Sequence, residues 1–177
     1  INVMKTLIQK LVLNNKHEIA YNTIKKLRAQ TEWDDFFSLE MGAYFGIQMA
    51  FEESVNEYLI YLNKNPSKVQ IISDKIMIYP NDPLITKEIE HILINSEINN
   101  SYIILSDLYF KNKEYDKAYS ILKNHNNFVK IFEHAQDLVT IGEYERSEKI
   151  LLDILNSNAS SKVLKYTVFE IAKIFES

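Results

Sequence analysis

The sequence contains no cysteine, and only three glycines and three prolines occur among its 177 residues. Without cysteine the chain has no disulfide framework, no thiolate nucleophile and no cysteine-ligated zinc site. The scarcity of glycine and proline argues against a sandwich or barrel of many short strands, because such folds need turn-forming residues at every connection. With 46% hydrophobic and 25% charged residues, the chain can still bury a core of ordinary size.

The sequence also lacks any block of basic residues. Its net charge is −4, and lysine and arginine are scattered among the acids. A protein that binds duplex nucleic acid needs a positive stripe that releases phosphate counterions, so we expect no nucleic-acid partner. Nearly apolar runs such as residues 76–79 are too short to span a bilayer, so we expect no membrane insertion by this segment.

The chain begins at Ile1 rather than at methionine. We therefore expect residues 1–177 to form a single domain that is a fragment of a longer chain, which leaves a signal peptide or anchor upstream open. The abundance of isoleucine, asparagine and lysine hints at an AT-rich genome, such as a bacterial or parasite one. The cellular compartment of the protein is likewise left unassigned.

An internal repeat is visible when residues 114–122 (EYDKAYSIL) are compared with residues 143–152 (EYERSEKILL). Both read acid, tyrosine, acid, basic residue and small residue, followed by apolar positions. A short break, residues 111–113 in one case and 141–142 in the other, precedes each segment, and an apolar-periodic stretch lies ahead of each break. This order predicts two copies of a unit in which two helices are joined by a tight turn. In the first copy the second helix begins at Tyr115.

The same order recurs at residues 40–66 and at residues 7–27, where Asn14 and Asn15 form the turn. The small residues of the second helices, which serve as markers, are separated by 34, 64 and 29 positions: Ala20, Ser54, Ala118 and Ser147. Because 64 is two periods of 32, a further unit is expected at residues 67–99, where Asp82 precedes Pro83 as a helix cap. A final helix begins at residue 163. We predict an all-α chain of about eleven helices, with a strand at residues 71–78 as the alternative there.

The repeated residues resemble the tetratricopeptide repeat (TPR) family. The best match follows the family's order of aromatic, large apolar and small residues at Tyr102, Leu105, Ser106, Tyr109, Tyr115, Ala118 and Leu122. The resemblance implies a right-handed α-α superhelix of about five helix pairs plus a final helix, in which small residues let paired helices cross closely and the units stack around one concave face. The chain departs from the pattern at His134, where leucine is usual, and throughout residues 67–99.

In the TPR family one face of each first helix lines the concave side. Carried over to this sequence, that face consists of Lys5, Gln9, Leu39, Glu40, Ala43, Ile103, Asp107, Phe110, Phe132 and Gln136. The resemblance implies that a protein or peptide binds there, and the mixed apolar lining suits an amphipathic helix or an extended apolar peptide. Glu40 and Asp107 would repel the acidic tails that chaperone-binding relatives grip.

No catalytic constellation stands out in the sequence. The four histidines have no partner at metal-ligand spacing, and the dispersed glycines form no phosphate-binding loop. We therefore predict no catalytic residue, cofactor or metal. His134, on an apolar helix face, is expected to be a buried or half-buried histidine with satisfied hydrogen bonds. Trp33 is expected to anchor its unit, with partner binding as the alternative.

These observations favour a non-catalytic scaffold or adaptor that binds a protein or peptide through its concave face. The alternative is a structural segment of a larger TPR array in a multiprotein assembly of the secretion or motility type. In that case the faces of the segment would serve self-association or subunit packing. The final helix motivates this alternative, because it ends on apolar Ile171, Ile174 and Phe175.

Overall fold

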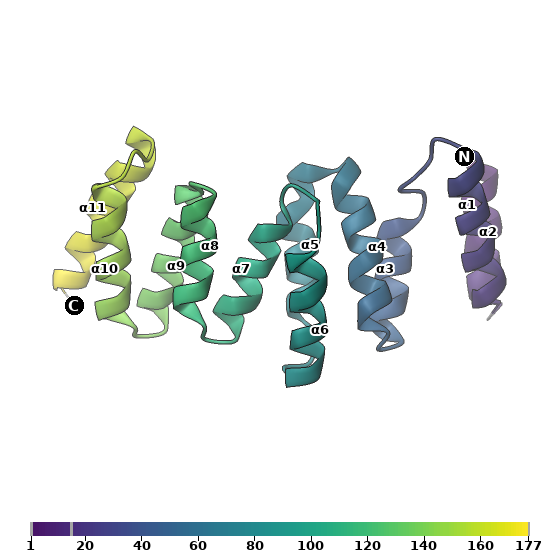
Figure 1. The fold of residues 1–177 in the computed structure, drawn as a ribbon, viewed down its shortest axis with the longest axis horizontal. Helices are drawn as coiled ribbons and strands as arrows, with labels where there is room; N and C mark the ends of the chain where they lie inside the picture. The colour runs from purple at the N-terminus through teal and green to yellow at the C-terminus, as the bar shows by residue number, and fades with distance from the viewer. Residues whose placement is uncertain (1, 15, 177) are drawn as a thin grey trace. The chain divides into compact units, whose positions relative to one another are not determined.

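The structure is a computed structural model that describes residues 2–14 and 16–176. Its regular structure within these residues is entirely helical, so the predicted all-α fold class is confirmed (Figure 1). The elements are α1 (Asn2–Leu13), α2 (His17–Gln30), α3 (Ser38–Ile47), α4 (Phe51–Lys64), a short 3-10 helix (Pro66–Lys68), α5 (Val69–Met77), α6 (Pro83–Ile94), α7 (Ser101–Lys111), α8 (Tyr115–Asn124), α9 (Phe128–Thr140), α10 (Tyr144–Leu155) and α11 (Ser161–Glu176). The strand considered for residues 71–78 is not formed, because most of this stretch lies in α5.

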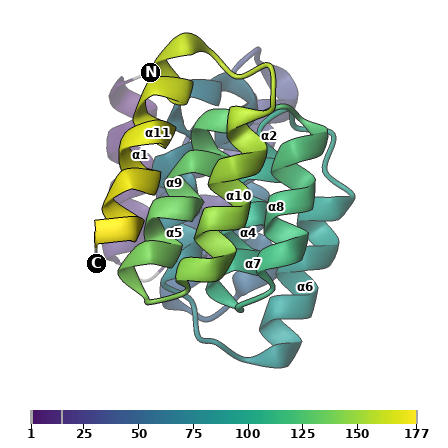
Figure 2. The same ribbon diagram turned by 90° about the vertical axis from the view of Figure 1, so that its left-hand side faces the viewer.

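Contacts within the chain gather in two compact units, the first unit (Ile1–Ile104) and the second unit (Leu105–Ser177). The boundary falls inside α7. A single domain over residues 1–177 therefore stays a prediction, and each unit is described by itself. In the second unit α9, α10 and α11 pack against one another, and Figure 2 shows these three helices side by side.

Two helix pairs repeat one close contact at the same sequence separation. The Ser54 hydroxyl of α4 donates a hydrogen bond to the carbonyl oxygen of Gly42 in α3 at 2.5 Å. The Ser147 hydroxyl of α10 donates in the same way to Ala135 of α9 at 2.7 Å. In both pairs twelve residues separate donor and acceptor, and all four residues are buried. A small side chain brings the second helix close to the first, and its hydroxyl finds a partner on the backbone of that helix.

The two remaining markers occupy matching positions. Ala20 is fully buried and Ala118 is 1% exposed, while the residues twelve positions earlier, Ile8 and Ser106, are fully buried. All four small residues that the sequence placed at helix crossings are therefore in the interior. Alanine in place of serine keeps the side chain small without a hydroxyl that needs a partner.

The turns between paired helices also repeat. The turn residue has a left-handed φ in three of them, 60° at Met49, 62° at Lys113 and 86° at Gly142. The next residue in each turn donates its N–H to the carbonyl five positions earlier at 2.8–3.0 Å, as in a Schellman helix end. Since α7 extends to Lys111 and α8 begins at Tyr115, the predicted turn lies one residue further along the chain. Asn15 of the first predicted turn is outside the described residues.

The irregular unit at residues 67–99 is a helix pair, α5 and α6, as predicted, and Asp82 caps α6 by accepting from the N–H of Leu84 at 2.8 Å. The role of Tyr79, two residues after the end of α5, was not anticipated. Tyr79 is 7% exposed, its ring lies 4.7 Å from that of Phe51, and its hydroxyl is hydrogen-bonded to that of Ser54. An aromatic side chain from the third helix pair thus fills space beside the α3–α4 crossing.

Candidate functional site

Two residues predicted to bind a partner, Asp107 and Phe110 of α7, face α9 in the second unit. The Oδ1 atom of Asp107 lies 2.9 Å from Nε2 of His134 and 3.1 Å from Nζ of Lys130. The side chains of Asp107 and Lys130 are only 11% and 12% exposed. The Phe110 ring lies 4.5 Å from the His134 ring and 5.1 Å from that of Tyr115. These contacts join the first helices α7 and α9.

The other two predicted residues of the second unit, Phe132 and Gln136 of α9, face α11. The ring of Phe132 lies 6.4 Å from that of Tyr166, and the Gln136 amide donates to Oε2 of Glu170 at 2.9 Å. Tyr166 is 49% exposed, and both α9 residues are half-buried. We call Phe132, Gln136, Tyr166 and Glu170 the α9–α11 face. It combines accessible aromatic surface with a polar pair whose geometry is fixed.

The remaining predicted residues lie in the first unit. Lys5 and Gln9 of α1 and Glu40 of α3 are exposed, whereas three others are half-buried, namely Leu39, Ala43 and Ile103. The exposed members carry one positive charge, one amide and one negative charge. They therefore make no cluster of one sign that would select a charged partner.

His134 is buried, as the sequence predicted, but its hydrogen bonds are satisfied only at Nε2, which lies beside Asp107. It is 5% exposed, and its Nδ1 atom has no hydrogen-bond partner among the described residues. A cavity of about 10 Å³ beside it is lined by residues from four helices, namely Phe110, Tyr115, Tyr119, Ile131, His134, Leu138 and Ile150. This volume is at the lower limit of what one water molecule needs. The small volume shows that the helix pairs pack closely here, and the cavity is too small for a ligand.

A groove of about 730 Å³ between the second helices α8 and α10 was not predicted from the sequence. Asp153 at this groove accepts hydrogen bonds from the Lys123 ammonium at 2.6 Å and from the hydroxyl of Tyr119. These bonds lower the pKa of the Asp153 carboxyl. Asp116 pairs with Arg146 further along the same helices. Both ion pairs join residues 30 positions apart, so a search for opposite charges at the repeat period would have found them.

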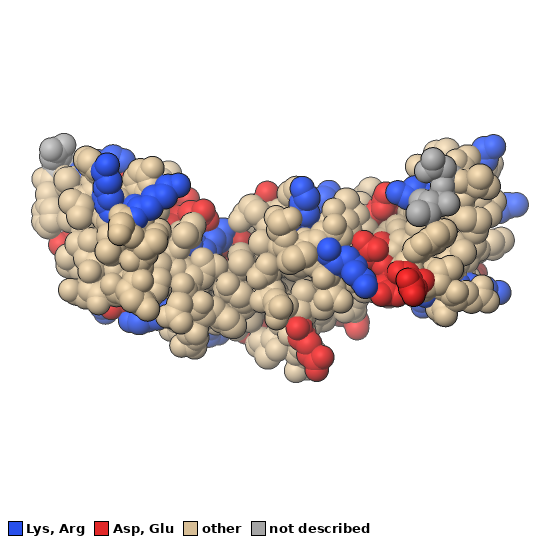
Figure 3. All heavy atoms as spheres, turned by 90° about the horizontal axis from the view of Figure 1, so that it is seen from above, with Lys and Arg blue, Asp and Glu red and all other residues tan. Residues whose placement is uncertain are grey.

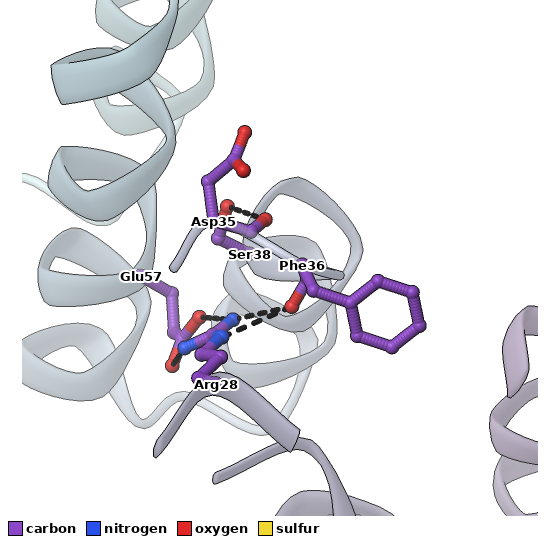
Figure 4. A network of polar contacts seen from close by, with 5 residues as sticks. All are labelled: Arg28, Asp35, Phe36, Ser38 and Glu57. Atoms are coloured by element: carbon purple, nitrogen blue, oxygen red, sulfur yellow. Dashed lines mark hydrogen bonds and ion pairs between the residues drawn. The ribbon is translucent and has the colours of Figure 1, made fainter. Parts of the chain in front are cut away.

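A buried polar network joins α2 to α4 in the first unit (Figure 4). The Arg28 guanidinium donates to both carboxylate oxygens of Glu57, at 3.0 and 2.7 Å, and twice to the carbonyl oxygen of Phe36. The Arg28 and Glu57 side chains are 12% and 4% exposed. Close by, the Ser38 hydroxyl donates to the carbonyl oxygen of Asp35 at 2.7 Å. The network fixes the turn ahead of α3 and is structural in character.

The charged surface gives no strong preference for a highly charged ligand. On the face shown in Figure 3, acidic and basic side chains occur in small groups of both signs. Within the described residues, no group of three or more histidine, aspartate or glutamate side chains is placed to hold a metal ion. None of the described helices has the length and apolar character needed to cross a membrane.

A scan against protein-family models finds no match to the chain, and searches of curated proteins and of solved structures find no significant match either.

Proposed function

We propose that this chain is a non-catalytic protein-binding scaffold or adaptor, built as a right-handed, TPR-like α-solenoid, that holds a protein segment on the α9–α11 face. The helix pairs support the architecture, because crossings and turns recur with the same residue separations. The single observation that carries the binding role is the pair of partly accessible rings, Phe132 and Tyr166, on neighbouring first helices.

The α9–α11 face suits an amphipathic helix or an extended apolar peptide. Aromatic side chains contribute most to binding when they are rigid and already positioned, since little side-chain entropy is then lost. The hydrogen bond from Gln136 to Glu170 links the two helices beside the rings. Glu170 also accepts from the Lys173 ammonium at 3.1 Å, so its charge is compensated locally and an apolar partner beside it does not leave a carboxylate unpaired.

Site-specific photocrosslinking tests this role. The photoreactive amino acid p-benzoylphenylalanine replaces Phe132 or Tyr166 in separate variants, and each is irradiated in an extract of the source cells. Tyr144 of α10 is the matched control, because it is an aromatic residue of nearly equal exposure, 46% against 49% for Tyr166. We expect one discrete crosslinked product from positions 132 and 166 and none from position 144. Phe132→Ala together with Gln136→Ala should weaken binding of the captured partner at least about tenfold.

Equal crosslinking from positions 144 and 166 would contradict the proposal, as would unchanged affinity of the double variant. Circular dichroism of each variant at 222 nm separates a loss of binding from a loss of helical structure.

A structural role in a larger assembly is the second candidate. On α11 three apolar side chains remain accessible, Val168 at 56%, Phe169 at 58% and Phe175 at 73%, whereas Ile171 and Ile174 are half-buried. An uncovered apolar helix face of this kind favours packing against another subunit. Sedimentation velocity tests it: association that rises with concentration and disappears in Phe169→Glu is expected, and a monomer at every concentration would rule it out.

A further inference from the structure

A second groove lies in the first unit, along the outward stripe of α4. It has a volume of about 380 Å³, and the α4 residues that line it recur at helical spacing: Asn56, Leu59, Ile60, Asn63 and Lys64. Asp34 of the turn before α3 and Ile98 of the segment between α6 and α7 complete the lining. Leu59 is 7% exposed, and Ile60 and Ile98 are half-buried. The groove therefore has an aliphatic floor and polar sides.

Two asparagine side chains border this floor with their hydrogen-bonding groups unused. Asn56 and Asn63 are exposed, and neither side chain makes a hydrogen bond to another described residue. They are seven residues apart on one helix, which places their backbones about 10 Å apart along the axis. An extended chain covers this distance in about three residues. A carboxamide offers a donor and an acceptor together, which is the complement of a peptide group.

One side of the groove is acidic. Lys64 forms an ion pair with Asp34 at 2.9 Å, and the negative charges of Asp35 and Glu32 act on the same ammonium group. Asp34 and Glu32 are both exposed to solvent. Three carboxylates thus act on one lysine, which leaves an excess of negative charge near Asp34 that a basic side chain would complement.

We propose that the α4 groove binds an extended peptide segment in which aliphatic and basic residues alternate. The aliphatic side chain covers Leu59, Ile60 and Ile98, and the carboxamides of Asn56 and Asn63 hydrogen-bond to its backbone. The basic residue lies against the carboxylates near Asp34. A bound helix fits less well, because its peptide groups are already hydrogen-bonded to one another and leave the two asparagines without partners. This proposal involves the first unit alone and does not depend on the α9–α11 face.

Fluorescence anisotropy with a synthetic probe tests the proposal on the whole chain. The probe is a labelled nonapeptide of alternating leucine and arginine, with glutamate in place of arginine in a second peptide. In a third peptide the leucine amides are N-methylated, which removes backbone donors and leaves the charge unchanged. We expect the arginine peptide to bind and the other two to bind at least about fivefold more weakly.

Asn56→Ala combined with Asn63→Ala is the decisive variant. Alanine has the highest helix propensity, so α4 should remain folded. Loss of two backbone hydrogen bonds should weaken binding of the arginine peptide at least about fivefold. The matched control is Asn124→Ala with Asn158→Ala, two exposed asparagines of the second unit. This control should bind the peptide with unchanged affinity.

Each other outcome overturns the proposal. If the Asn56 and Asn63 double variant binds as the unaltered chain does, the asparagines do not read the backbone. If the N-methylated peptide binds equally well, the attraction is electrostatic only. If no peptide binds, the groove has no such ligand.

Discussion

Replacement of Gly42 by alanine should destabilise the protein, although the same change in an ordinary helix is stabilising. A Cβ atom at this position would lie 2.5 Å from two ring carbons of Tyr58 and 3.0 Å from a third. Tyr58 is 3% exposed, so its ring has little space into which to move. Overpacking costs about 1–3 kcal/mol, and contacts of 2.5 Å against a buried ring put this change at about 2–3 kcal/mol. The gain from glycine to alanine within a helix is about 1 kcal/mol. We therefore expect a net loss of about 1–2 kcal/mol.

Urea and thermal unfolding followed at 222 nm measure this loss. For a unit of about 100 residues, the melting temperature should fall by about 5–10 °C. The partner variant Tyr58→Ala removes all three side-chain atoms that would lie nearest to the new Cβ, and in that background Gly42→Ala should become stabilising by about 0.5–1 kcal/mol. A Gly42→Ala variant that is more stable than the unaltered chain would refute the close crossing of α3 and α4.

Three further changes test other parts of the fold. Ala118→Leu enlarges a side chain that is 1% exposed, at the predicted crossing of α7 and α8, and should cost about 1–3 kcal/mol. Unchanged thermal stability would contradict that crossing. Arg28→Ala leaves the buried carboxylate of Glu57 without its ion-pair partner and should lower the free energy of unfolding in urea by about 3–5 kcal/mol. The double variant Arg28→Met with Glu57→Leu should restore most of that loss. The bonds that lower the pKa of Asp153 stabilise the fold above the ordinary aspartate pKa, and this stabilisation is lost as the pH falls through the lowered pKa. In Asp153→Asn the free energy of unfolding in urea should therefore depend less on pH between about pH 5 and 2. The difference should be under about 1 kcal/mol because the site is exposed.

Much of the fold was predictable because it depends on short-range patterns. Ala20, Ser54, Ala118 and Ser147 could be recognised as crossing residues since small side chains recur at a fixed place in each second helix. Helix starts and turns depend on residues near them in sequence, as at Asp82, which caps α6. The all-α class and the position of the helix pair at residues 67–99 required nothing more than this local information.

The contacts between helix pairs were not predictable in the same way. Tyr79 reaches back to Ser54, and Arg28 meets Glu57 over 29 residues, in contacts that depend on how neighbouring pairs stack. Periodicity places a side chain on a face but does not say which neighbour that face meets. For the same reason Asp107 was predicted as a residue open to a partner, although Lys130 and His134 occupy its carboxylate.

The hydroxyls of Ser54 and Ser147 both bond to a backbone carbonyl, so the acceptor is the same chemical group in both helix pairs. The acceptor belongs to the main chain, which every residue possesses, so the hydrogen bond itself places no demand on the side chain of the first helix, although neighbouring rings can, as Tyr58 does at Gly42. Gly42, Ala135 and Ser106 all serve at the first-helix position. The left-handed turn position is occupied by Met49, Lys113 and Gly142, although glycine alone adopts a positive φ without strain. The same close crossing can therefore form in two helix pairs although the residue that supplies the carbonyl differs between them.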